Sequence, residues 1–296
     1  MIHYSSEVQD AVRKKSPLVA LESTIISHGL PRPSNKVVAL EVEEIVRSNG
    51  AVPATIAILD GEIHVGLNAS ELDRVANDEG ITKASIRDLP IVRAKNLSAA
   101  TTVAATSHIA HLAGISIFAT GGLGGVHRGA QESWDESADL HSLANIPVMV
   151  ISAGAKSILD VAATLERLET LSVPIVGYRT SRFPGFYLID SGFELEYRVD
   201  SPSEVASIWK ERKNLGISRS GMVVANPVAL QMDPEIHART LADGLRAAEA
   251  ENISGKAVTP FLLEYFHANT GGESLRVNID IIKSNAALAA QIAAAL

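Results

Sequence analysis

The chain has 296 residues, of which 46% are hydrophobic and 20% charged, a composition typical of a compact protein with a sizeable core. Its 34 acidic and 26 basic residues give a formal net charge of -8, so no sequence-wide attraction to nucleic acid or to an anionic membrane is expected. The absence of cysteine excludes disulfides, thiolate metal sites and thiol catalysis. Because the first residues lack a basic region followed by an apolar stretch, and no run approaches the roughly 20 apolar residues of a membrane span, we expect a cytoplasmic protein.

Short apolar runs alternate with amphipathic segments along the chain. The runs predicted as buried strands are residues 18–21, 52–59, 115–119, 148–151, 174–178 and 222–225. The segments predicted as helices are residues 35–49, 101–113, 138–145, 157–171, 202–215, 234–251 and 274–296. This alternation predicts an α/β fold with a layered, largely parallel sheet and helices on both faces.

One pair of strands is predicted to be antiparallel. Asp60-Gly61 separates the apolar residues 55–59 from residues 62–66, and this dipeptide between two such runs is a strong hairpin signal. No linker rich in Pro, Gly or Ser divides the chain, and no repeat of fixed period is present. Residues 1–296 are therefore predicted to form a single domain.

Polar side chains follow several of the predicted strands, where open α/β sheets place their ligand sites. Glu22 ends the strand at residues 18–21; taken alone, it is as compatible with a salt bridge or a cap as with catalysis. Residues 82–90 include Lys83, Ser85 and Arg87. Two cations and a hydroxyl suit a phosphate, although a solvated charged turn has the same sequence.

Four glycines lie within residues 121–125, directly after the strand at 115–119. They allow the backbone to approach an anion or a sugar closely. The segment is neither a dinucleotide fingerprint, because His127 takes the place of the last glycine, nor a Walker P-loop. A flexible turn is the generic interpretation, and the adjacent His127 and Arg128 favour a binding loop.

Three carboxylates gather in the next polar segment, at Asp135, Glu136 and Asp139, around Ser137 as a plausible helix N-cap. Oxygen ligands of this kind suit Mg²⁺ or Mn²⁺, which often keep several waters and use one or two protein carboxylates. Acidic capping of a helix start explains the same residues without a metal, and composition does not choose between the two.

A lysine lies among small residues after the strand at 148–151. Lys156 follows Ser-Ala-Gly-Ala and precedes the helix predicted at 157–171. Burial disfavours the charged form of an amine, which leaves a neutral nucleophile in part of the population. A lysine that reaches the surface from a helix start is the ordinary alternative. The pairing of an amine with the carboxylate of Glu22 is what a covalent, acid-base mechanism requires.

The last predicted helix ends in an almost uncharged stretch. Residues 279–296 are rich in Ala and Leu, but Asp280, Lys283 and Asn285 interrupt them. We therefore expect a core or subunit-contact helix and not a membrane element. An exposed apolar surface on it would need covering, which favours an oligomer.

Taken together, these motifs resemble the pseudouridine-5'-phosphate glycosidase family from about residue 17 to residue 287. The matching segments are residues 21–24, 28–31, 52–57, 120–129, 135–140, 153–160, 178, 183–187, 258–263 and 271–279. The resemblance implies reversible cleavage of the C–C glycosidic bond of pseudouridine 5'-phosphate to uracil and ribose 5-phosphate. It also implies a manganese-dependent homotrimer.

The resemblance assigns roles to individual residues. Lys156 matches the nucleophile of the family, Glu22 its proton donor and Asp135 its ligand to Mn²⁺. The positions that match substrate-binding residues are Lys83, Val103, Thr120, His127, Ser137, Ala138, Asp139 and Asn278. The chain departs from the expected family pattern at Arg179, Arg182 and Arg276. These departures affect the expected loop contacts and subunit packing, and none replaces a residue with a role in the reaction.

Two other functions are compatible with these motifs. Relatives of this fold accompany pigment biosynthesis of the indigoidine type, so the same site could serve a secondary-metabolite pathway. A non-catalytic sugar-phosphate sensor would need the glycine loop and Lys83, but it would have no use for Lys156 together with Glu22. The joint presence of these two residues weighs against a sensor.

Overall fold

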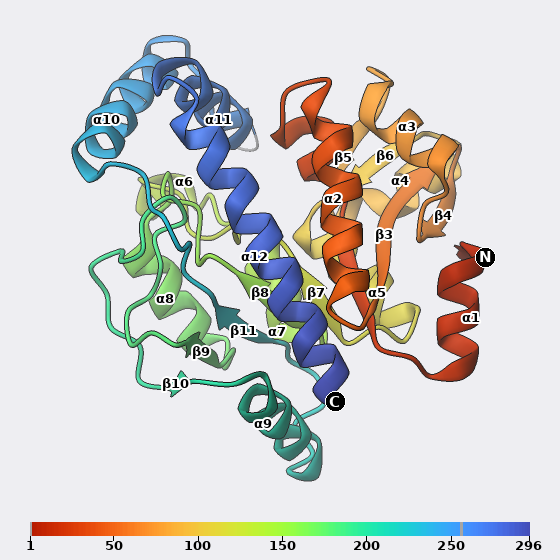
Figure 1. Cartoon of the computed structure of the whole chain (residues 1–296). Coiled ribbons are helices and arrows are strands. Elements are labelled where there is room, and N and C mark those ends of the chain that lie inside the picture. Colours follow the sequence, from red (N-terminus) through yellow and green to blue (C-terminus); the bar gives the residue numbers. More distant parts are fainter. Residues whose placement is uncertain (1, 255–256) are drawn as a thin grey trace.

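A mixed sheet of eleven strands forms the centre of the part of the chain that the computed structural model describes, residues 2–254 and 257–296 (Figure 1). The main order is β1-β4-β3-β2-β7-β8-β11-β9-β10, and β6 pairs with both β3 and β5. The strands are β1 (Ile2–Tyr4), β2 (Leu18–Glu22), β3 (Val52–Leu59), β4 (Glu62–Val65), β5 (Thr82–Ala84), β6 (Ala99–Thr101), β7 (Ile117–Ala119), β8 (Met149–Ser152), β9 (Ile175–Tyr178), β10 (Arg198–Val199) and β11 (Met222–Ala225).

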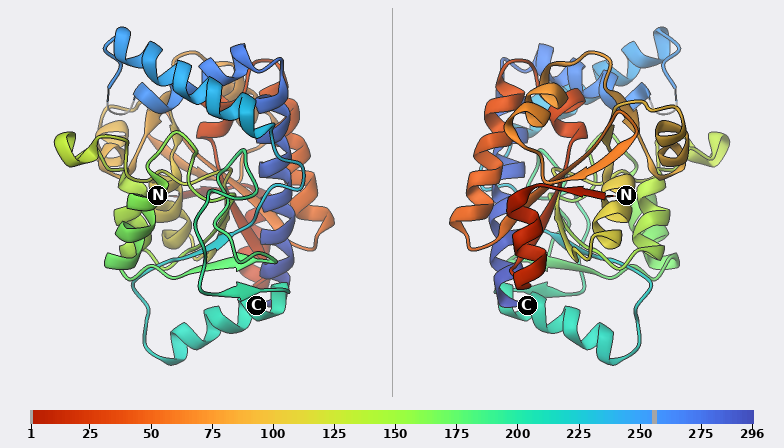
Figure 2. Two further views of the ribbon diagram at one scale, coloured as in Figure 1. Left: turned by 90° about the vertical axis from the view of Figure 1, so that its left-hand side faces the viewer. Right: turned by 90° about the vertical axis from the view of Figure 1, so that its right-hand side faces the viewer.

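Helices cover both faces of the sheet (Figure 2). They are α1 (Ser6–Lys14), α2 (Ser34–Ser48), α3 (Ala69–Asn77), α4 (Leu89–Ala94), α5 (Val103–Leu112), α6 (Ala130–Ser133), α7 (Ala138–Asn145), α8 (Val161–Thr170), α9 (Pro202–Asn214), α10 (Pro234–Ala250), α11 (Val258–Asn269) and α12 (Glu273–Ala295), with a π-helix η1 (Ile25–Gly29) and a 3-10 turn η2 (Ile86–Asp88). Residues of α2, α9 and α12 share one core with the sheet, and residues of α1, α5, α7 and α8 share another.

The central strands are parallel, as predicted. β2 pairs in parallel with β3 and β7, and β8 pairs in parallel with β7 and β11. Every residue of β7, β8 and β11 is buried, which explains why these strands are continuous apolar runs and not alternating patterns. The largely parallel α/β sheet is confirmed.

The predicted hairpin is also present. β3 pairs antiparallel with β4, and Ile58 lies opposite Ile63. Asp60 (φ 50°) and Gly61 (φ 77°) at the turn are both left-handed, as a type I′ turn requires. β6 adds a second antiparallel partner to β3, so the antiparallel part of the sheet is larger than the sequence indicated.

One predicted helix begins later than expected. The segment 157–171 was predicted to be helical throughout, but α8 begins at Val161 because Asp160 caps it, its carboxylate accepting the backbone N–H of Ala163 at 3.0 Å. Lys156 therefore lies in a loop between β8 and α8 and not at the start of a helix.

The C-terminal helix α12 is confirmed, and of the two roles expected for it, core helix or subunit contact, the structure shows a core helix. It packs between α2 and α9 and against β2, β7 and β8, and most of its apolar side chains are buried within the chain. Burial of α12 therefore does not require a partner subunit. Among the described residues, no helix combines the length and apolarity that crossing a membrane requires.

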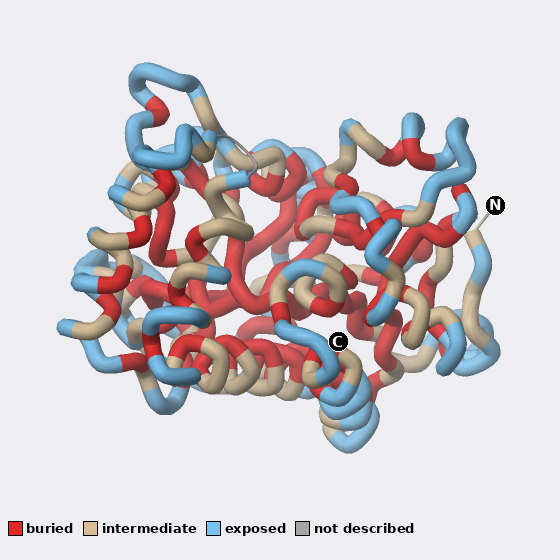
Figure 3. Tube along the Cα trace, turned by 90° about the horizontal axis from the view of Figure 1, so that it is seen from above, coloured by how far each residue is buried: buried red, intermediate tan, exposed pale blue. Residues whose placement is uncertain are grey.

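The carboxyl ends of the central strands lie beneath a pair of helices. α10 and α11 pack on each other at the upper end of the molecule in Figure 1, and α11 also contacts η1 and α12. Viewed from that end, buried chain fills the middle of the molecule (Figure 3). Residues that leave β2, β7 and β8 are thereby brought together under α11.

Candidate active site

A cavity of about 500 Å³ opens at the carboxyl edge of the sheet. Glu22 ends β2 and Lys156 follows β8, and β2 and β8 both flank β7 in the sheet. The polar side chains that line the cavity are Glu22, Thr24, His28, Lys83, Lys156, Thr259 and Asn278, and its apolar wall is formed by Ile25, Phe186, Pro260 and Leu263. The predicted nucleophile and proton donor therefore face one cavity together with two of the predicted substrate-binding residues, Lys83 and Asn278.

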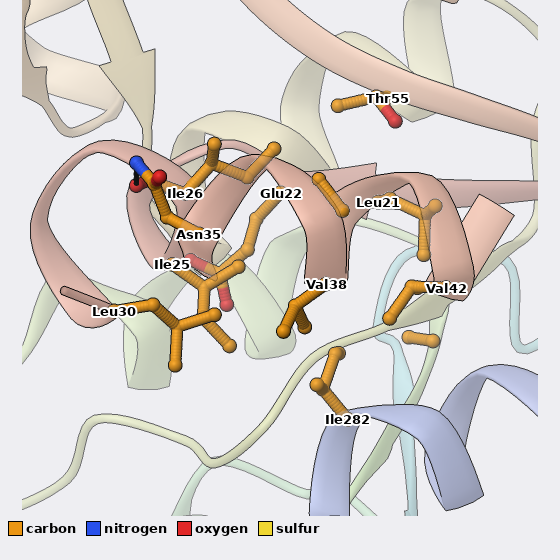
Figure 4. Close-up of a pocket in the computed structure, with 12 residues that line it drawn as sticks. Leu21, Glu22, Ile25, Ile26, Leu30, Asn35, Val38, Val42, Thr55 and Ile282 are labelled. Atoms are coloured by element: carbon orange, nitrogen blue, oxygen red, sulfur yellow. Dashed lines mark hydrogen bonds between the residues drawn. The ribbon is translucent and has the colours of Figure 1, made fainter. Parts of the chain in front are cut away.

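Glu22 is disposed to carry a proton. Burial raises the pKa of its carboxyl group above the ordinary value of 4.5, and Lys156 and a hydrogen bond donated by the Thr120 hydroxyl act in the opposite direction. A second cavity of about 360 Å³, lined mainly by aliphatic side chains of β2, η1 and α2, also reaches Glu22 (Figure 4). This apolar surrounding disfavours the charged carboxylate.

Lys156 is presented by a loop with little freedom. Its backbone N–H donates to the carbonyl of Leu123 at 3.1 Å, and the N–H of Leu123 donates to the carbonyl of Gly154 at 2.9 Å. Gly154 has a left-handed φ of 77°, and a Cβ there would collide with the backbone of Pro184. The small residues before Lys156 thus let two loops pack together and leave the amine at the cavity wall.

The glycine loop forms the floor of the same cavity. Gly121 and Gly122 line it, and a Cβ at Gly122 would lie 2.6 Å from Cδ2 of Phe186. Glycine is needed here because the aromatic ring rests directly on the backbone. The predicted binding loop is placed at the cavity, and Phe186 is a wall residue that sequence reasoning did not assign.

Asp139 connects the glycine loop to the start of α5. Its carboxylate is buried and accepts the backbone N–H groups of Ala104 at 3.0 Å and Gly124 at 2.8 Å. Ser137 caps α7 as predicted, accepting the N–H of Asp139 at 3.2 Å. Four residues predicted to bind substrate do not line the cavity: Val103, Ser137, Ala138 and Asp139. Their contact with substrate stays a prediction.

The three carboxylates of residues 135–139 do not converge on one point. Asp135 lies beside His127, with Oδ2 at 3.8 Å from Nδ1, whereas Glu136 pairs with Arg167 at 2.9 Å and Asp139 binds backbone N–H groups. Burial lowers the pKa of His127, and the carboxylate of Asp135 opposes that shift. Within residues 2–254 and 257–296, no group of three His, Asp or Glu side chains is arranged to hold a metal ion.

The arginines that depart from the family pattern have partners of their own. Arg182 pairs with Asp190 at 2.9 Å and with Glu194 at 3.1 Å, and Arg276 pairs with Asp280 at 3.0 Å. Arg179 lies over the ring of Tyr178, 5.0 Å from its centroid. None of the three arginines lines the cavity.

Several cavity residues had no role predicted from the sequence. His28 lies in η1, and Thr259, Pro260 and Leu263 belong to α11, which the apolar pattern did not predict as a helix. The segments 28–31, 183–187 and 258–263 match motifs of the family, and this match is the sequence signal for them. Their function follows from the folding of α11 over the strand ends.

The chain matches the family model of indigoidine synthase A like protein over residues 7–295. It is 57% identical over 296 residues to the pseudouridine-5'-phosphate glycosidase of Salinispora tropica, covering 99% of this chain and 91% of that protein. It is 50% identical over 297 residues to the protein of the same name from Caldanaerobacter subterraneus, covering 100% and 96%.

Solved structures of other proteins share the fold. The prealnumycin C-glycosynthase AlnA, in complex with ribulose 5-phosphate, superimposes with a TM-score of 0.92 at 34% identity over 100% of this chain and 97% of that one. An indigoidine synthase A-like protein from Thermotoga maritima gives a TM-score of 0.90 at 36% identity, over 99% and 96%.

Proposed function

The chain belongs to the indigoidine synthase A like family, and from this premise we propose that it reversibly cleaves the C–C glycosidic bond of pseudouridine 5'-phosphate to uracil and ribose 5-phosphate. The observation that carries the proposal is the meeting of Glu22, whose pKa is raised, with Lys156 at one cavity. A sugar-phosphate sensor would not need this pair. Identity of 57% to a pseudouridine-5'-phosphate glycosidase against 34% to the prealnumycin C-glycosynthase favours the glycosidase reaction.

The leaving atom explains why a lysine is used. In an ordinary glycosidase two carboxylates act around an oxocarbenium ion, and the departing atom is an oxygen that is easily protonated. Here the departing atom is carbon 5 of uracil. An amine bonded to C1' of the sugar provides an alternative, because its nitrogen can accept the positive charge as the carbon-carbon bond breaks.

In the cleavage direction, neutral Lys156 attacks C1' while the C1'–O4' bond breaks, and Glu22 gives its proton to O4'. The adduct nitrogen returns a proton to Glu22, which delivers it to carbon 5 of uracil. The lone pair of the Lys156 nitrogen then forms an iminium as the bond from C1' to uracil breaks. Addition of water to the iminium releases ribose 5-phosphate and the free amine, and the proton that this hydrolysis frees returns to the Glu22 carboxylate. The raised pKa of Glu22 suits a group that begins this cycle protonated.

The remaining cavity residues suit the two ends of the substrate. Lys83 brings a positive charge to the cavity, which fits the phosphate. Asn278 offers both a donor and an acceptor to a pyrimidine edge, and the ring of Phe186 offers an aromatic face. We assign Thr120 the role of holding Glu22, because its hydroxyl donates a hydrogen bond to the Glu22 carboxylate.

For the metal, we propose that Asp135 is the main protein ligand to Mn²⁺. A single carboxylate beside His127, without a closed set of protein donors among the described residues, fits a hard cation that keeps most of its water. When bound, the ion supplies positive charge that orders the phosphate end of the substrate.

Removal of the metal is expected to stop activity without unfolding the protein. A chelator should abolish uracil release, and Mn²⁺ should restore it, while circular dichroism and the melting temperature change little. Asp135→Asn should raise the Mn²⁺ concentration needed for half-maximal activity. Its matched control is Glu136→Gln, because Glu136 is adjacent but pairs with Arg167. Global unfolding on chelation would identify a structural metal and reject this role.

We also propose the homotrimer that the family resemblance implies, although α12 is covered within the chain. Light scattering of the purified protein should give the mass of three chains, and the mass of one chain would reject the proposal.

The proposed reaction is tested by its choice of bond. With Mn²⁺ present, pseudouridine 5'-phosphate should yield uracil and ribose 5-phosphate in equal amounts, and the two products should recombine to a C-glycoside. Uridine 5'-phosphate, which differs by a C–N bond to the same base, serves as the control and should be cleaved much more slowly. Failure to release uracil from the C-glycoside would refute the proposed function.

A further inference from the structure

A buried pair of asparagines holds the backbone of Thr120. The Asn285 side chain on α12 donates from Nδ2 to the carbonyl oxygen of Thr120 at 2.7 Å. Its Oδ1 accepts from Nδ2 of Asn226 at 2.9 Å, and Asn226 also donates to the hydroxyl of Ser284 at 3.0 Å. Asn285 is 0% exposed and Asn226 is 7% exposed. Two buried amides in contact are costly unless their hydrogen bonds are satisfied, so this arrangement is closely specified.

The pair joins the ends of three neighbouring strands to one helix. Asn226 directly follows β11, and its backbone N–H donates to the carbonyl of Ser152, the last residue of β8, at 2.8 Å. Thr120 directly follows β7, and its N–H donates to Ile151 of β8 at 3.0 Å. The carbonyl and N–H of Thr120 are thus both fixed, by α12 and by β8.

Fixing the backbone of Thr120 also fixes the direction of its hydroxyl. Thr120 is fully buried, and its Oγ1 donates to Oε1 of Glu22. The residues that hold Thr120 lie outside the cavity, whereas Asn278, about two turns earlier on α12, lines it. The helix that presents a cavity residue therefore also determines how the acid is held.

We infer that Asn285 and Asn226 are positioning residues that hold the Thr120 hydroxyl on Glu22 and thereby set where the catalytic proton resides. This inference rests on the proposed function. The hydrogen bond from Thr120 stabilises the carboxylate and lowers the pKa of Glu22, against the larger effect of burial. The other charged groups that act on Glu22 are Lys156, Lys83 and Asp139, and Asn285 binds none of them directly.

The sign of the effect follows from that hydrogen bond. If Asn285→Ala releases Thr120, the carboxylate of Glu22 loses a donor and its pKa rises further. The limb of the kcat profile that reports Glu22 should move to higher pH, as it should in Thr120→Val. Asn285 lies outside the cavity and acts on the acid through Thr120, with a longer contact of 3.4 Å to the carbonyl of Gly121. We therefore expect kcat to fall by about 10- to 100-fold, the loss that a small misplacement causes, and KM to change much less.

The decisive experiment measures pH profiles of uracil release for the parent, Thr120→Val, Asn285→Ala and the double variant. The double variant should show the shift of Thr120→Val and little more, because both changes break one chain of contacts. Asn226→Ala removes a single hydrogen bond to Asn285 and should shift the limb in the same direction by a smaller amount. This variant replaces Asn285→Ala in the experiment if Asn285→Ala does not fold.

The matched control is Ser220→Ala. Ser220 is buried and lies just before the first residue of β11, at the end of that strand opposite to Asn226. Its hydroxyl accepts a hydrogen bond from Arg212 at 3.0 Å, so removal of the hydroxyl also lowers stability. Ser220→Ala should leave the pH profile in place. The inference would be overturned if the parent cleaves substrate and both Asn285→Ala and Asn226→Ala keep the parental limb. The proposed reaction would still hold in that case. A fully additive shift in the double variant would also overturn the inference.

Discussion

Lys156→Ala is expected to lower the cleavage of pseudouridine 5'-phosphate by about 10⁴-fold or more, the size of loss that removal of a covalent nucleophile causes in other enzymes. Backbone hydrogen bonds that Leu123 makes with Lys156 and with Gly154 hold the loop that carries Lys156, and an alanine preserves them. The fold should therefore remain, and the variant should melt near the temperature of the parent. Steady-state release of uracil measures the effect.

A surface lysine provides the control for this variant. Lys36 pairs with Asp73 at 2.6 Å, and neither residue lines the cavity. Lys36→Ala removes the same amine and should keep the parental rate, because a partly exposed ion pair contributes about 1 kcal/mol or less to stability. Turnover by Lys156→Ala within about tenfold of the parent would be too small a loss for a nucleophile and would show that the amine is not one.

Glu22→Gln is expected to slow turnover by about 10²- to 10⁴-fold, the usual contribution of a general acid or base. Glutamine keeps the shape and can still contact Thr120, but it cannot move a proton to the sugar oxygen or to the uracil carbon. Binding of ribose 5-phosphate should survive, and an adduct on Lys156 should still form. Activity should fail at the making or breaking of the bond to uracil.

The pH dependence provides a second readout of Glu22. Because the mechanism starts from protonated Glu22, the limb that reports this residue is the one on which activity falls as the pH rises and Glu22 loses its proton. Burial raises the pKa of Glu22, so this limb should lie above the ordinary value of 4.5, and Glu22→Gln should lose it. Glu43 is a matched control, because burial also raises the pKa of its carboxyl group but it binds Thr55 outside the main cavity. Glu43→Gln should keep the parental limb. Near-parental turnover by Glu22→Gln would make Glu22 a structural carboxylate, and Asp139 would be the next acid to test.

The central sheet could be predicted from the sequence because its strands are buried on both sides. β3 and β11 have the predicted bounds, since each is a continuous apolar run. The strands β1, β5, β6 and β10 were not predicted, because two or three residues are too few to show a pattern unless, as in β7, they lie within a longer predicted run. The late start of α8 was missed because residues 157–159 are apolar enough to extend a helical pattern, whereas the cap at Asp160 decides the boundary.

The pairing of Glu22 and Lys156 could be predicted because parallel strands carry the residues that follow them to one edge of the sheet. The partners of the acidic segment could not. Asp139 binds N–H groups of Ala104 and Gly124 that lie far from it in sequence, and only the folded chain brings them together. The roles of Asn226 and Asn285 had no sequence signal for the same reason.

The most direct test is chemical trapping of the sugar on the protein. Borohydride is added to the protein with ribose 5-phosphate and Mn²⁺, and the digested peptides are weighed by mass spectrometry. We expect the mass of the reduced sugar phosphate on the peptide that contains Lys156, and none after Lys156→Ala. A label on Lys83 instead, or no label on a protein that turns over its substrate, would contradict the lysine mechanism.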